Sequence, residues 1–161
     1  MKQLLCFLFT FVLWLLLTWS RALPDVAAGV FFALLVSTLL AQIYPDNPEK
    51  GLNPVRWFWL LLYIPYFLYY CLKANLDVAY RVLHPDMPIR PGIVRVRTDL
   101  ASEMAKTILA NSITLTPGTL SVDIVGQDLY VHWINVRGET EAEHTAEIVK
   151  RFERLIRRIF E

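Results

Sequence analysis

The residues best suited to chemistry lie in one stretch, NSITLTPGTLSVDI, which begins at Asn111 and is rich in hydroxyl side chains. A Ser or Thr hydroxyl becomes a nucleophile when a base and an orienting group stand beside it. The three histidines belong to unrelated predicted elements, so none is an evident base; they are His84, His132 and His144. Pro117 and Gly118 instead fit the central positions of a type II turn, because Gly tolerates φ > 0. The stretch therefore predicts a structural turn rather than a catalytic site.

Other chemical motifs are missing from the sequence. There is no glycine-rich phosphate loop, Walker motif, zincin signature or CxxC pair. Cys6 and Cys71 lie inside apolar runs, where a free cysteine behaves as a small hydrophobe. Glu141 and Glu143 suit the first turn of a helix better than an acid/base pair. We therefore predict no catalytic residue, no cofactor, no metal and no disulfide, and the net charge of +1 argues against a nucleic-acid partner.

This stretch lies in the polar C-terminal half of the chain, which follows a strongly apolar N-terminal half. The chain has 161 residues and is 55% hydrophobic, and nearly all of the excess lies before Lys73. Three uncharged apolar runs predict transmembrane helices at about 3–20, 26–44 and 57–76, since a membrane helix needs about 20 mostly apolar residues. The alternative for the first run is a cleaved signal peptide, but TWSRALPD offers no convincing small-x-small cleavage site and the apolar core is long for a signal. Residues 1–84 are thus predicted to form a transmembrane domain.

The apolar runs themselves, 4–19, 26–44 and 57–72, carry no Asp, Glu, Lys or His, the residues that usually mark an ion path through lipid. We interpret them as packing elements. Ala28, Gly29 and Ala33 form a small-residue patch where another helix can approach closely. Pro65 is expected to kink the third helix.

Three spans place the two chain ends on opposite sides of the membrane. The basic residues split unevenly between the sides, and cytoplasmic segments normally carry more of them. This predicts an N-terminus outside and a cytoplasmic C-terminal domain in the cell membrane. The residues expected inside are Arg21, Lys73, Arg81 and Arg90, and those expected outside are Lys2, Lys50 and Arg56.

The polar half is predicted to fold as a small α+β domain. Residues 85–92 form a Pro-rich linker, and residues 93–161 show the pattern β-α-β-β-α. Thr98 or Asp99 is expected to cap the first helix of this domain. Leu120, Val122 and Ile124 are expected on one face of a strand. The last segment, TEAEHTAEIVKRFERLIRRIF, reads as one helix whose basic end faces anionic lipid, a partner subunit or solvent.

At this point a family resemblance adds to the analysis. NSITLTPGTLSVDI, followed by LYVHWINV, resembles the signature of the E subunit of the Mrp-type multisubunit Na+/H+ antiporters; related subunits occur in membrane-bound hydrogenase complexes with an Mrp-like module. The likeness covers essentially the whole chain. It implies a structural and docking role for the signature positions, which are Asn111, Ser112, Thr114, Thr116, Pro117, Gly118 and Thr119.

Two functions stay open at this point. The resemblance implies an accessory, non-catalytic membrane subunit needed for assembly and ion transport of a cation (Na+)/proton antiporter, or of a hydrogenase complex carrying such a module. Its partners would be the other subunits and the lipid bilayer. The alternative is a stand-alone membrane-anchored sensor or binding domain, which would be stable by itself and have a pocket in its cytoplasmic part.

Overall fold

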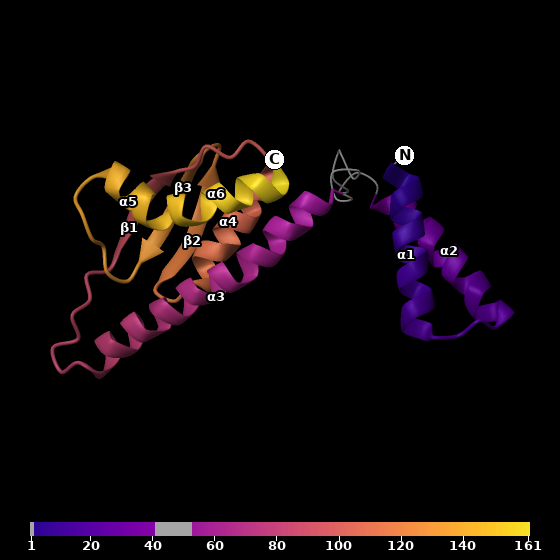
Figure 1. Ribbon diagram of the computed structural model, residues 1–161, viewed down its shortest axis with the longest axis horizontal. Coiled ribbons are helices and arrows are strands. Elements are labelled where there is room, and N and C mark those ends of the chain that lie inside the picture. The colour runs from indigo at the N-terminus through magenta and orange to yellow at the C-terminus, as the bar shows by residue number, and fades with distance from the viewer. Residues whose placement is uncertain (1, 41–52) are drawn as a thin grey trace. The chain divides into compact units, whose positions relative to one another are not determined.

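The computed structural model describes residues 2–40 and 53–161, and the chain divides into two compact units, Met1–Asn53 and Pro54–Glu161 (Figure 1). The expected end of the second span, at residue 44, and most of the Pro- and Gly-rich loop that follows lie outside the described residues. Each unit has its own packing and is described by itself.

The first unit is a helical hairpin of α1 (Lys2–Thr18) and α2 (Leu23–Leu39). The indole Nε1 of Trp14 donates to the backbone oxygen of Asp25 at 2.9 Å and ties the two helices together. Gly29 is buried against the same indole, and a Cβ there would lie 2.8 Å from Trp14 Nε1. Ala33 is fully buried and Ala28 half-buried. The predicted small-residue patch therefore faces α1 in this hairpin.

The second unit combines the long helix α3 (Pro54–Leu83) with an antiparallel sheet and three further helices. The sheet has the order β1-β3-β2, with β1 at Gly92–Arg97, β2 at Thr119–Val125 and β3 at Asp128–Trp133. Helices α4 (Glu103–Leu115), α5 (Glu141–Ile148) and α6 (Lys150–Phe160) pack on the sheet and on one another, and α3 runs along α6 (Figure 1).

Helix α3 shares a core with the α+β part. Tyr63 is buried, and the rings of Phe67 and Tyr70 lie 6.1 and 5.7 Å from the ring of Phe152 on α6. The expected transmembrane domain, residues 1–84, includes this helix with the two before it and stays a prediction. By its packing α3 belongs to the second compact unit, because its aromatic stripe lies on α6 and α4.

The three apolar helices differ in whether they are long enough to span a membrane. Helix α3, with 30 residues, is long and apolar enough to cross a bilayer. Helices α1 and α2 are apolar but have 17 residues each, the lower limit for a span. Three transmembrane helices thus stay a prediction. Pro65 lies on the exposed face of α3, which continues through it without a break.

Three local expectations about the α+β part are wrong. The N-cap of α4 is Ser102, whose hydroxyl accepts from Ala105 N, and neither Thr98 nor Asp99 caps this helix. Those two residues bind Glu153 and Lys150 of α6 instead. The final helix breaks at Val149 into α5 and α6.

The expected face of β2 is the third error, because a bulge lies between Ser121 and Asp123. An extra residue in a strand shifts the alternation of all later side chains. Leu120 therefore pairs with His132, whereas Ile124 pairs with the buried Leu129.

Candidate functional site

The turn at the centre of the signature connects α4 to β2. Its backbone closes through a hydrogen bond in which Thr119 N donates to Thr116 O at 3.3 Å. Gly118 follows Pro117 and has φ +89, the geometry of a type II turn. A Cβ on Gly118 would lie 2.9 Å from Cγ2 of Ile134. Both the backbone angle and the close neighbour therefore call for glycine here.

The hydroxyl groups of the signature bind backbone atoms around this turn. Thr116 Oγ1 donates to Ser112 O at 2.7 Å, and Thr119 Oγ1 donates to Ile113 O at 2.6 Å. Thr114 Oγ1 accepts from Ser121 N at 3.1 Å. These bonds join the last turn of α4 to the first residues of β2. The arrangement holds a turn and presents no activated nucleophile.

Ser112 links this turn to the long helix. Its Oγ donates to Ile108 O at 2.6 Å, so the 2.5 Å bond to Tyr63 on α3 is donated by the tyrosine hydroxyl. Ser112 and Tyr63 are both buried, 4% and 7% exposed. A buried polar pair of this kind is costly to break, because the remaining group loses its partner. The signature therefore fixes α3 on α4.

Asn111 differs from the other signature residues because its side chain is exposed on α4. Within residues 2–40 and 53–161 we find no hydrogen bond to this side chain. It is separate from the turn and contributes nothing visible to the fold. An exposed polar residue in an otherwise structural motif is free to contact another protein.

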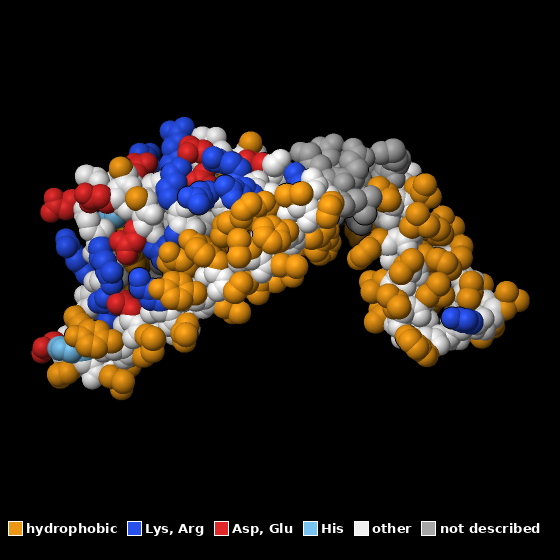
Figure 2. All heavy atoms as spheres, in the orientation of Figure 1, with side chains coloured by type: hydrophobic (Ala, Val, Ile, Leu, Met, Phe, Trp, Pro, Cys, Tyr) orange, Lys and Arg blue, Asp and Glu red, His pale blue; other side chains and the backbone are white. Residues whose placement is uncertain are grey.

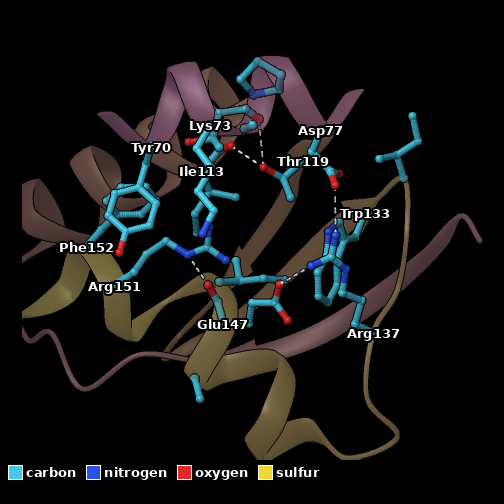
Figure 3. A pocket seen from close by; sticks show the side chains of 17 residues that line it. Tyr70, Lys73, Asp77, Ile113, Thr119, Trp133, Arg137, Glu147, Arg151 and Phe152 are labelled. Carbon is cyan, nitrogen blue, oxygen red and sulfur yellow. Dashed lines mark hydrogen bonds and ion pairs between the residues drawn. The ribbon is translucent and has the colours of Figure 1, made fainter. Parts of the chain in front are cut away.

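A cavity of about 330 Å³ lies beside the turn, between α3, α5 and α6 (Figure 3). Turn residues 116–119 form one wall, and Trp133 and Phe152 lie deeper. The remaining wall is charged. Its charged residues are Lys73, Asp77, Arg137, Glu147 and Arg151.

Three of the five charged residues around the cavity pair with one another inside the chain. Asp77 binds Arg81 at 2.8 Å and Arg137 at 3.1 Å, and Arg137 also lies 3.7 Å from Glu147. The Arg151 side chain lies over the ring of Tyr70 and donates to the backbone oxygen of Glu147, and burial lowers the pKa of this guanidinium. These ion pairs balance part of the wall, whereas Lys73 and Arg151 form no ion pair within the described residues.

The group of charged residues along this wall was not predicted from the sequence. Lys73, Asp77 and Arg81 are spaced four residues apart, as are Glu147 and Arg151, and this spacing brings side chains together on a helix. The pattern was a usable signal within each helix. The ion pair of Asp77 with Arg137 joins residues far apart in the chain, and no local pattern shows it.

The described residues hold no group of three or more His, Cys, Asp or Glu side chains suited to a metal ion. The histidines also lie apart. His132 is exposed on β3, His84 follows α3, and His144 packs edge-on against Trp133. The structure thus brings the signature residues 112–119 together around a turn and leaves Asn111 outside it.

Comparison with known proteins identifies the family of this chain. The model of a family described as Na+/H+ ion antiporter subunit matches residues 7–159. The chain belongs to this family. Two curated relatives, both named as the E1 subunit of a Na+/H+ antiporter, are each 30% identical. The protein of Staphylococcus epidermidis RP62A aligns over 93% of this chain and 92% of its own length, and that of Staphylococcus saprophyticus over 99% and 97%.

Chains of two solved membrane complexes are also similar to this chain. A chain of the membrane-bound sulfane sulfur reductase, an archaeal respiratory membrane complex, is 42% identical with a TM-score of 0.78, and 99% of each chain is covered. A chain of the Mrp complex from Dietzia sp. DQ12-45-1b is 29% identical with a TM-score of 0.46, covering 68% of this chain and 100% of that one. The expected resemblance to the E subunit of these antiporters is confirmed.

Proposed function

We propose that this chain is a non-catalytic membrane subunit of a multisubunit Na+/H+ antiporter, or of a respiratory membrane complex that carries a related module. Family membership over residues 7–159 is the observation that carries the proposal. The site agrees with it, because the signature hydroxyls bind backbone atoms, and Asp77, Arg137 and Glu147 pair with one another. The chain then contributes assembly, and larger partners move the ions.

The docking part of this function falls on the exposed end of the signature. The internal bonds of Ser112, Thr116 and Thr119 fix the positions of α3, α4 and β2 relative to one another. Asn111 is left on the surface of α4, and its amide has no hydrogen bond within the part of the chain that the structure describes. We assign Asn111 to contact with a neighbouring subunit, and the buried signature residues to holding it in position.

Membrane attachment is assigned first to the α1–α2 hairpin. Its exposed side chains are apolar on both helices, and many of them are leucine and phenylalanine. The α+β part is assigned to the cytoplasm because most of the basic residues lie in it or beside it. A third crossing by α3, and with it an outside N-terminus, is the expectation from hydropathy alone.

The test is a mild-detergent pull-down of the tagged full-length chain, followed by mass spectrometry. Large polytopic antiporter-like subunits are expected in the retained material. The variant N111A is expected to lower their recovery severalfold, whereas T107A, one turn earlier on the same exposed helix, leaves recovery unchanged. A lone, stable, monodisperse chain would instead support the stand-alone binding domain and contradict the proposal.

A further inference from the structure

Helix α3 is attached to the α+β part over most of its length. Its covered side chains recur every three to four residues, which is one face of a helix. At the start, Arg56 donates to the backbone oxygen of Glu161 at 3.0 Å. In the middle, Tyr66 donates to Arg151 O at 2.8 Å. Near the end, Asp77 lies 3.1 Å from Arg137 of the α+β part. The helix is therefore held to that part from its first turn as far as Asp77.

The opposite side of α3 is an uncharged apolar arc. The charged residues of this helix all lie on the covered stripe or at its border; they are Arg56, Lys73, Asp77 and Arg81. The arc includes Leu61, Leu68 and Leu76, which are 66%, 58% and 65% exposed. Its one amide, Asn75, donates to Cys71 O within the helix. Figure 2 shows this apolar surface as a continuous band along α3.

A transmembrane placement of α3 conflicts with this attachment. The attached stretch from Arg56 to Asp77 measures about 32 Å at about 1.5 Å per residue, so in a crossing helix it would fill the roughly 30 Å hydrocarbon core. A crossing helix would carry α6, with exposed Arg154 and Arg158, into lipid, at about 2.5–3.5 kcal/mol for each charge near the centre. Detaching α3 would instead expose the core around Phe152. Both alternatives are unfavourable.

Basic side chains line one edge of the arc. The guanidinium of Arg158 lies 4.2 Å from the ring centroid of Trp59, and that of Arg151 lies 5.5 Å from the ring of Tyr70. Arg154 stands between them on the same side of α6, and Lys73 borders the same edge. Figure 2 shows blue side chains directly beside the apolar band. Apolar side chains next to arginines match the acyl chains and phosphates of an anionic bilayer surface.

We infer that α3 lies in the plane of the membrane, with its uncharged arc in the boundary between headgroups and acyl chains. Arg154 and Arg158 then lie at the level of the lipid phosphates, and the α+β part rests on the bilayer. This inference holds for whichever complex contains the chain.

One consequence concerns the N-terminus. If α1 and α2 alone cross the membrane, the N-terminus lies on the same side as the α+β part. Lys2, Lys50 and Arg56 then join the other basic residues on that side, and Arg21 alone lies opposite. This distribution obeys the positive-inside rule better than three crossings do.

Sidedness gives the first test. Single cysteines at Gln3, Ala22 and Gln127, in a chain with Cys6 and Cys71 replaced by serine, are labelled with an impermeant maleimide in intact cells. We expect Q3C and Q127C to behave alike and A22C to behave oppositely. Three crossings predict that Q3C differs from Q127C, and that result would overturn the inference.

Depth gives the second test. Spin labels at L61C, L68C and L76C are compared in nanodiscs that contain phosphatidylglycerol. An in-plane helix gives equal oxygen accessibility at all three sites, whereas in a crossing helix successive sites, seven and eight residues apart, differ by about 10–12 Å in depth. The same accessibility measurement within the purified complex tests whether lipid or a partner subunit covers the arc. Loss of oxygen access at all three sites there would mean that a partner subunit covers the arc, and would contradict lipid contact.

The arginines have a test of their own. The purified chain is expected to retain phosphatidylglycerol over phosphatidylcholine, and R154Q to lower this ratio at least twofold. The matched control is R97Q, since Arg97 bonds to Gln127 on the strands of the sheet. An unchanged ratio in R154Q would remove the phosphate contact from the inference.

Discussion

Replacing Gly118 by alanine perturbs the signature turn in a way that the structure makes quantitative. The residue has φ +89, and an L-residue in the left-handed region costs about 1–2 kcal/mol. The new methyl group would also lie 2.9 Å from Cγ2 of Ile134, and relieving such overpacking costs about 1 kcal/mol or more. We expect G118A to lower the free energy of unfolding by about 2–3 kcal/mol.

The chain offers a matched control at Gly126. This glycine also has positive φ, +64, but nothing lies within 4 Å of an added Cβ. G126A should therefore show the backbone cost alone, about 1–2 kcal/mol. Urea unfolding of the full-length chain in detergent, followed by near-UV circular dichroism, measures both variants. Equal losses in G118A and G126A would show that the contact with Ile134 has no energetic weight, and that our account of the turn is wrong.

Other predictions concern the links around the turn and the pH dependence of α6. S112A leaves the Tyr63 hydroxyl unpaired in the core and should cost about 1–3 kcal/mol, and the double variant with Y63F should cost less than the sum of the single changes. P117G should loosen the turn and reduce complex assembly, as judged by subunit stoichiometry; wild-type stoichiometry and transport would refute this. The hydrogen bond from Lys150 lowers the pKa of Asp99, so its stabilising effect is present above about pH 4 and is lost as pH falls through the lowered pKa. D99N should therefore be less stable than wild type at pH 7, and the two unfolding curves should converge in acid.

Local signals in the sequence predicted the parts of the structure that depend on neighbours in the chain. Pro117 and Gly118 predicted the turn, because each has a conformational preference of its own. The alternation from Ile93 to Arg97 predicted β1. The capping of α4 was misassigned because three nearby residues, Thr98, Asp99 and Ser102, share the chemistry of an N-cap. Only the bonds to Glu153 and Lys150 decide among them.

The rest depended on contacts between distant residues. The bulge in β2 is set by pairing with β3, and nothing in the spacing of Leu120 and Ile124 reveals it. The cavity wall depends on Arg137 meeting Asp77 across sixty residues of chain. The strongest conclusions from sequence therefore concern the turn, and the weakest concern what surrounds it.

Helix α3 shows why hydropathy identified an apolar helix without establishing its placement. Both sides of the helix are rich in large apolar residues, so an average over its length looks like a membrane span. The two sides differ in chemistry, however. The covered side has tyrosines whose hydroxyls reach Ser112 and Arg151 O, and the arc has leucines with no such partner. A helix surrounded only by lipid would have no partners for the two tyrosine hydroxyls. Their partners belong to the α+β part, and so the polar half of the chain determines how its longest helix meets the membrane.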